Sequence, residues 1–113
     1  MPDRPEIVCL CGSIRFADEM SAATRDLTFA GVIVVAPGVF PRAAAHEAGE
    51  PITDEQPITD EQKAALAALH LRKIDLADRV LVVNPGGYIG ESTSREIAYA
   101  RAAGKPISFT DPA

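Results

Sequence analysis

The sequence has few of the residues that cross-link small proteins or bind polyanions. It contains two cysteines and two histidines with no spaced Cys/His set, so we expect no metal site and no cofactor. Cys9 and Cys11 lie two residues apart in an apolar run. We expect their side chains to point to opposite faces of a strand, which argues against a disulfide. The net charge is −5 without a block of Lys or Arg, which excludes a nucleic acid polymer or an anionic membrane surface as the expected partner.

Long apolar runs are also missing. No run reaches the ~20 residues that cross a bilayer. Residues 1–6 lack the basic start and apolar stretch of a secretory signal. These absences lead us to expect a cytoplasmic protein. The 113 residues, 47% hydrophobic and 24% charged, suit a single globular domain over 1–113.

Short β-branched segments alternate with helical patterns along the chain. We expect strands at 7–11, 32–36, 79–84 and 106–109, and helices at about 16–29, 59–76 and 92–103. This alternation predicts βαβ units and a parallel sheet covered on both faces. The expected fold class is therefore α/β, in the smallest doubly wound arrangement, with strand order about 2-1-3-4.

The longest irregular stretch, residues 37–58, is rich in Pro, Gly and Ala and is expected to form a lid-like loop. The hexapeptide Pro-Ile-Thr-Asp-Glu-Gln occurs at 51–56 and again at 57–62. Each copy offers a Thr-x-x-Gln capping box, so either copy could start the second helix. We interpret the repeat as a local duplication that carries no chemistry.

Two turns with small residues follow the first and third strands, at the edge where open parallel sheets bind ligands. Helix-start N–H groups, hydroxyls and a guanidinium are suited to a phosphate. The residues expected to bind it are Gly12, Ser13, Ile14, Arg15, Gly87, Gly90 and Ser92. The alternative interpretation is that these are ordinary tight turns with capping hydroxyls.

Glu96, near the start of the third helix, is the predicted catalytic carboxylate. If it faces the crevice, it could attack or stabilise a sugar carbon that bears positive charge. The alternative is structural, because Thr93-x-x-Glu96 is itself a capping box in which Glu96 only accepts a bond from a backbone N–H. The local sequence leaves both interpretations open.

Four segments together resemble the nucleoside 2-deoxyribosyltransferase superfamily: CGSIR at 11–15, AD at 77–78, GYIGES at 87–92 and EIAYA at 96–100. The nearest branch hydrolyses nucleoside 5′-monophosphates. The resemblance implies a flavodoxin-like three-layer α/β/α domain with four to five parallel strands. It also implies a homodimer or higher homo-oligomer in which the partner completes each site. Glu96 would be a nucleophile that forms a glycosyl-enzyme intermediate, and Ser13, Arg15 and Ser92 would bind phosphate.

The chain departs from this family at two positions. Relatives often carry Tyr at the position of Cys9 and Asp at the position of His70. If those residues assist departure of the base, this chain must use another group, and His70, Asp75 and Tyr88 are the candidates. For His70, the alternative is a packed or surface histidine without a catalytic role.

The function expected is hydrolysis of the N-glycosidic bond of a (deoxy)nucleoside 5′-monophosphate, releasing free base and sugar phosphate. Transfer of the sugar to a second base is an alternative, as is a non-catalytic module that senses a nucleotide. The run Pro85-Gly86-Gly87 with Gly90 and Glu96 also resembles the motif of cytokinin-nucleotide phosphoribohydrolases. Those proteins have a tighter Gly-Thr-x-x-Glu spacing and a longer chain, so this interpretation ranks lower.

Overall fold

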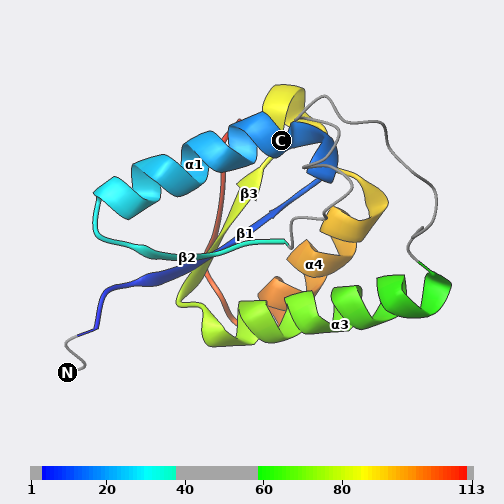
Figure 1. The fold of residues 1–113 in the computed structure, drawn as a ribbon. Helices are drawn as coiled ribbons and strands as arrows, with labels where there is room; N and C mark the ends of the chain where they lie inside the picture. Colours follow the sequence, from blue (N-terminus) through cyan, green and yellow to red (C-terminus); the bar gives the residue numbers. More distant parts are fainter. Residues whose placement is uncertain (1–3, 38–58, 112–113) are drawn as a thin grey trace.

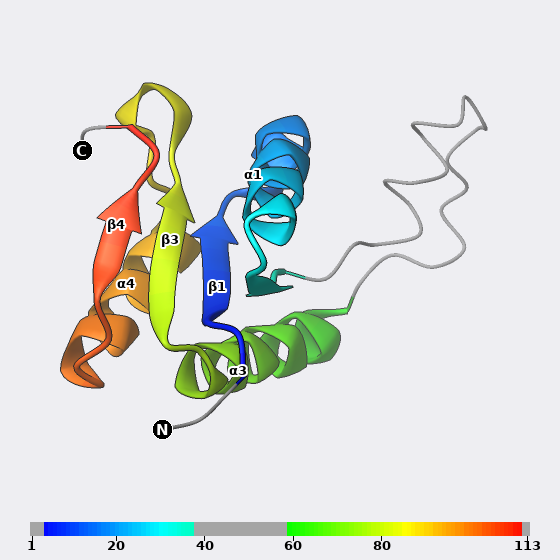
Figure 2. The same ribbon diagram turned by 90° about the vertical axis from the view of Figure 1, so that its left-hand side faces the viewer.

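A computed structural model of the chain describes residues 4–37 and 59–111. Its centre is a sheet of four parallel strands in the order β2-β1-β3-β4. The strands are β1 (Ile7–Gly12), β2 (Ile33–Val35), β3 (Arg79–Val83) and β4 (Ile107–Phe109). Figure 2 shows β4, β3 and β1 side by side with their carboxyl ends at the same edge. The predicted strand order is confirmed.

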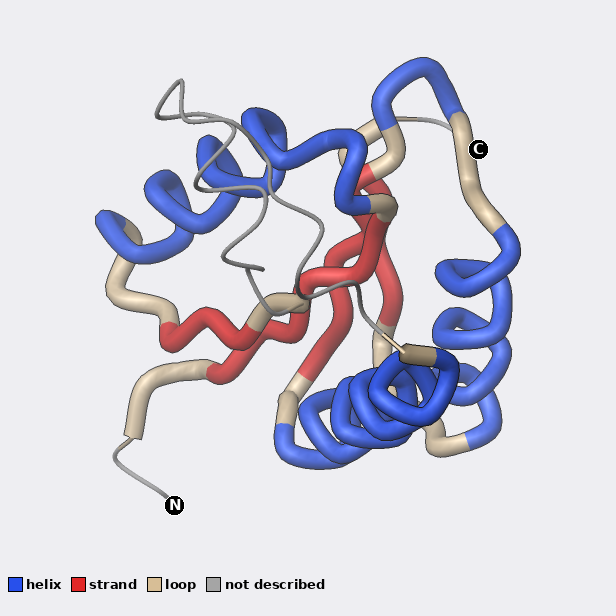
Figure 3. The backbone as a smooth tube through the Cα atoms, turned by 45° about the vertical axis from the view of Figure 1, so that its right-hand side comes forward, coloured by secondary structure: helices blue, strands red, loops and turns tan. Residues whose placement is uncertain are grey.

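Helices lie on both faces of the sheet. They are α1 (Ala17–Phe29), α3 (Asp60–Leu76) and α4 (Glu91–Ala102), with short 3-10 turns η1 (Ile14–Phe16) and η2 (Pro85–Gly87). α1 covers one face, whereas α3 and α4 pack beside each other on the opposite face (Figures 1 and 3). The expected three-layer α/β/α arrangement is therefore present. Among the described residues, no helix is long and apolar enough to span a membrane.

The strand β1 is buried on both faces, as a central parallel strand should be. Val8 and Leu10 pack toward α1. Cys9 and Cys11 both pack in the cluster on the opposite face, with Ile74 of α3. The expectation that the two cysteines point to opposite faces is therefore wrong: side chains alternate along a strand, so residues i and i+2 share a face. Both thiols are buried and free.

Local sequence signals determine how α3 and α4 begin and end. Thr59 is the N-cap of α3, and its capping box with Gln62 is complete in both directions. The second copy of the hexapeptide therefore starts the helix, while the first copy and the predicted loop from residue 38 onward lie outside the described residues. Gly104 has φ of +75° just after α4, the conformation expected of a glycine at a helix C-terminus.

The amino end of β1 is tied to the β3 side of the sheet through Asp78. The Asp78 carboxylate accepts two bonds from the Arg4 guanidinium, at 2.7 and 2.9 Å, and a third from the Ile7 N–H at 2.8 Å. These bonds hold the pKa of the Asp78 carboxyl well below its usual range, with the Arg4 bonds as the main cause. The contacts therefore stabilise the folded chain only while Asp78 is ionised.

Candidate active site

Glu96 lies in the second turn of α4, not in its capping turn. The N-cap of α4 is Gly90, and no side chain caps this helix end. Because α4 begins at Glu91, Thr93 lies inside the helix, where it is buried. The Thr93-x-x-Glu96 capping box therefore does not form. The Glu96 side chain is 17% exposed and approaches His70 of α3. The capping-box alternative for Glu96 is therefore excluded.

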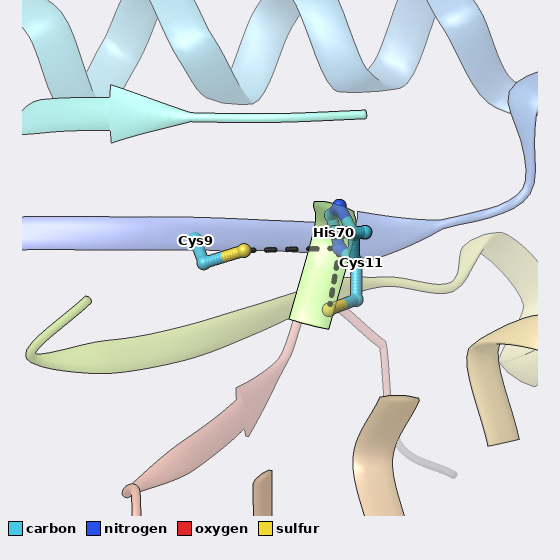
Figure 4. A group of neighbouring side chains, drawn as sticks. All are labelled: Cys9, Cys11 and His70. Carbon is cyan, nitrogen blue, oxygen red and sulfur yellow. Dashed lines mark hydrogen bonds between the residues drawn. The ribbon is translucent and has the colours of Figure 1, made fainter. Parts of the chain in front are cut away.

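His70 lies at the centre of a buried polar cluster between α3, α4 and β1. His70 is only 5% exposed. Its Nε2 atom is 3.6 Å from Glu96 Oε1, 3.4 Å from Cys11 Sγ and 3.7 Å from Cys9 Sγ. Figure 4 shows the ring of His70 between the two thiols of β1. We call Cys9, Cys11, His70 and Glu96 the Cys-His-Glu cluster.

Burial and mutual charge perturb every ionisable group of this cluster. Burial raises the pKa of Glu96, although the nearby His70 opposes the shift. Burial by itself would lower the pKa of His70, but Cys9 and Glu96 together raise it. The interaction with the neighbouring Cys11 thiol lowers the pKa of Cys9, and the interaction with Cys9, together with burial, raises the pKa of Cys11. Perturbed groups that gather in one place are typical of functional sites.

The cluster also contains polar atoms without a bond. Glu96 Oε1 and His70 Nδ1 are buried and have no hydrogen-bond partner among the described residues. Leaving such an atom unbonded costs about 1–3 kcal/mol. A cost of this kind at two neighbouring side chains favours a site that a ligand completes.

The other two candidates for leaving-group assistance have different contacts. The Asp75 carboxylate accepts a bond from the Tyr99 hydroxyl at 2.7 Å and pairs with Arg72 at 3.1 Å. Tyr88 is 42% exposed and lies in the turn after β3. Of these three predicted candidates, His70 is the one whose side chain pairs with Glu96.

The two predicted phosphate-binding turns meet each other. The Arg15 guanidinium lies over the Tyr88 ring, 4.5 Å from its centroid, and Phe16 meets the same ring edge-on at 5.8 Å. Ser13 caps η1, where its Oγ accepts a bond from the Arg15 N–H at 3.2 Å. Ile14 is the first residue of η1. The sequence prediction that these turns converge is therefore supported by direct contacts.

Backbone geometry explains two of the predicted glycines, Gly12 and Gly87. A Cβ at Gly12 would lie 2.7 Å from the Val83 carbonyl oxygen, so only glycine fits between β1 and β3 here. Gly87 has φ of +83°, a conformation that favours glycine. Gly90 is the N-cap of α4, and the exposed Ser92 accepts a bond from Arg95 at 3.3 Å.

Sequence reasoning missed the role of the two cysteines and of Asp111. The cysteines are distant from His70 in sequence, and only the packing of α3 against β1 joins them. Asp111 accepts a bond from the Gly86 N–H at 2.7 Å, so a carboxylate already occupies one donor of the second turn. That contact places a negative charge of the protein itself against the second turn.

Two surface hollows lie on either side of the sheet. One of about 290 Å³ lies between α4 and β4, lined by Ile89, Ile97 and Phe109 among others. Another of about 450 Å³ lies between α1 and the β3–β4 edge, and Asp111 lines it. Glu96 lines neither of these two hollows.

Neither a family model nor a curated protein matches the chain. Solved structures match it in fold. A 2-deoxyribosyltransferase from the psychrotolerant bacterium Bacillus psychrosaccharolyticus is 19% identical with a TM-score of 0.62, over 91% of this chain and 70% of that one. A conserved protein from Enterococcus faecalis V583 is 18% identical with a TM-score of 0.58, over 93% of this chain and 62% of that one.

These likenesses define the fold. The chain is a flavodoxin-like α/β protein with the sheet order and layers described above. More particularly, it has the fold of a 2-deoxyribosyltransferase. Because identity is low, the likeness shows the fold and not the reaction, and the chain spans less than the full length of either neighbour.

Proposed function

We propose that this protein hydrolyses the N-glycosidic bond of a (deoxy)nucleoside 5′-monophosphate, with Glu96 as the nucleophile. The single observation that carries the proposal is the position of the Glu96 carboxylate. One of its oxygens is buried without a partner, and it lies 3.6 Å from His70 Nε2. A partly desolvated carboxylate stabilises an oxocarbenium-like transition state better than one in water.

The proposed reaction has two steps. A Glu96 oxygen bonds to the anomeric carbon while the bond from that carbon to the base nitrogen breaks, and the leaving base takes a proton from His70. Water then attacks the anomeric carbon of the glycosyl ester, its proton returns to His70, and Glu96 leaves as a carboxylate. His70 suits this role because Cys9 and Glu96 raise its pKa, which favours the protonated imidazole.

The substrate phosphate is proposed to bind at the two turns. Arg15, held against Tyr88, supplies the cation, and the start of α4 at Gly90 supplies N–H groups. These donors favour a phosphorylated substrate over a free nucleoside. The family resemblance implies a homodimer or higher homo-oligomer in which the partner completes each site, and we include this assembly and a cytoplasmic location in the proposal.

A direct assay tests the reaction. The protein is incubated with ribo- and deoxyribonucleoside 5′-monophosphates, and free base is separated by chromatography. Release of base by the wild type that disappears in Glu96→Gln supports the hydrolase. Tight nucleotide binding without any release would favour a sensing module instead.

Deoxyribosyl transfer is the second candidate. It is favoured by the fold shared with a protein described as a 2-deoxyribosyltransferase. In that reaction a second base, rather than water, attacks the glycosyl ester. Adding an acceptor base to the same assay separates the two, because transfer produces a new nucleoside or nucleotide and hydrolysis does not.

A further inference from the structure

We propose that Cys9, Cys11, His70 and Glu96 form a binding site for a thiophilic divalent cation such as Zn²⁺. The three residues Cys9, Cys11 and His70 offer ligand atoms that all lie within 4.8 Å of one another. All three side chains are buried, and Figure 4 shows both thiols turned toward the His70 ring. Glu96 approaches the same nitrogen from α4, with its Oε1 atom at 3.6 Å, and would be the fourth ligand.

The distances from His70 match those around a tetrahedral zinc ion. Zinc lies about 2.3 Å from a sulfur ligand and about 2.0–2.1 Å from a nitrogen or oxygen ligand. In a tetrahedral site these bond lengths place N and S ligand atoms about 3.6 Å apart, and N and O ligand atoms about 3.4 Å apart. The corresponding separations from His70 Nε2 are 3.4 Å to Cys11 Sγ, 3.7 Å to Cys9 Sγ and 3.6 Å to Glu96 Oε1. The ligand atoms of Cys9, Cys11 and His70 lie within 4.8 Å of one another, so a bound cation would need only a small inward movement of the thiols.

The chemistry of the donors identifies the class of cation. Thiolate and imidazole ligands prefer Zn²⁺ and other soft or borderline ions, whereas Mg²⁺ and Ca²⁺ prefer oxygen. Binding replaces the two thiol protons, which pass to solvent, and no electron is transferred. The cation would also satisfy Glu96 Oε1, which lacks a partner among the described residues. Partial exposure of Glu96 gives a route from solvent.

Occupation of this site has a consequence for the proposed reaction. A carboxylate that coordinates a cation is not free to attack a sugar, so the bound metal would inhibit base release. This consequence rests on the proposed function. The binding itself does not, because it needs only the four side chains.

The test is a titration of the reduced full-length protein with Co²⁺, followed by displacement with Zn²⁺. We expect one equivalent of Co²⁺ to give a thiolate-to-metal charge-transfer band and the visible bands of tetrahedral cobalt, both lost when Zn²⁺ is added. Cys9→Ala and Cys11→Ala should each weaken binding by more than the roughly 10–100-fold that loss of an outer-shell partner costs. Because these are the only cysteines in the sequence, no other thiol can supply the band.

Matched controls keep the test decisive. Glu91→Gln changes an exposed carboxylate on the same helix and should leave the cobalt spectrum unchanged, whereas Glu96→Gln should alter it. Circular dichroism checks that each variant folds, and the wild-type spectrum needs no variant at all. The proposed site is overturned if the folded wild type shows no charge-transfer band. It is also overturned if Cys9→Ala and Cys11→Ala both bind Co²⁺ as tightly as the wild type. Base release is measured on the metal-free protein. Cobalt binding by a protein whose metal-free form releases no base would overturn only the proposed function, and base release by the metal-free protein without any cobalt binding would overturn only the metal site.

Discussion

His70 of α3 and Glu96 of α4 lie 3.6 Å apart at their nearest nitrogen and oxygen, although no local pattern in the sequence joins them. Both side chains are largely withdrawn from solvent, and their charges influence each other's pKa. The pair places a proton donor beside a nucleophile. It also distinguishes His70 from Asp75 and Tyr88, which are engaged elsewhere.

His70→Ala should lower kcat for ordinary nucleotides by roughly 10²–10⁴-fold, the usual contribution of a general acid. In 7-methylguanosine 5′-monophosphate the base is already cationic and can leave without taking a proton. The same change should therefore lower kcat for this nucleotide much less. The measurement is kcat for both substrates. His46→Ala, which changes the only other histidine, is the control. An equal loss for both substrates would mean that His70 acts on structure and not on the leaving group.

Arg15→Ala should raise KM for a nucleoside 5′-monophosphate by about 10- to 100-fold, because a charge-assisted hydrogen bond contributes about 1.5–3 kcal/mol. The same change should leave the much weaker reaction of the corresponding nucleoside nearly unaffected. Arg25→Ala removes an exposed arginine of α1 that pairs with Asp26 and serves as the control. Similar losses for nucleotide and nucleoside would contradict a phosphate-binding role.

Asp78 predicts how stability depends on pH. Its pKa is depressed in the folded chain, so the unfolded chain binds more protons in acid. The contribution of Asp78 is therefore complete above its unfolded pKa and is lost progressively as pH falls below about 4. Asp78→Asn should be less stable than the wild type at pH 7 and should lose less on acidification. Denaturant unfolding at pH 7 and at pH 3 measures this, and parallel curves for both proteins would exclude the mechanism.

The duplicated hexapeptide offers an internal control for helix capping. Thr59→Ala removes the side-chain cap of α3 and should cost about 1 kcal/mol of folding free energy, or about 4 °C in Tm. Thr53→Ala makes the same change in the first copy and should leave Tm nearly unchanged, because α3 begins at Asp60. Thermal unfolding of the two variants side by side is the measurement. Equal shifts would mean that the helix can start from either copy.

Much of the fold follows from the sequence because its signals are local. The strands β1 and β3 are β-branched runs buried on both faces, and their observed bounds differ from the predicted ones by only one residue. Thr59 and Gly104 mark helix ends through capping chemistry that needs no tertiary contact. The sheet order then follows from the way βαβ units connect.

The site could be predicted only in part, because its key contacts are tertiary. The glycine turns can be predicted at Gly12 and Gly87, where a close backbone approach and a positive φ limit the choice of residue. The contact of His70 with Cys9 and Cys11 depends on how α3 packs against β1. The role of Thr93 was ambiguous, since a capping box and a buried helix residue look the same in sequence, and only the start of α4 distinguishes them.

The central claim is that the Glu96 carboxylate is the reagent that breaks the glycosidic bond. The most direct measurement compares base release from nucleoside 5′-monophosphates by wild type, Glu96→Gln and the exposed-site control Glu91→Gln. We expect Glu96→Gln to lose roughly 10³-fold or more of kcat, as loss of a nucleophile does, with its fold and nucleotide binding retained. Glu91→Gln should match the wild type. Base release by Glu96→Gln at the wild-type rate would contradict the account.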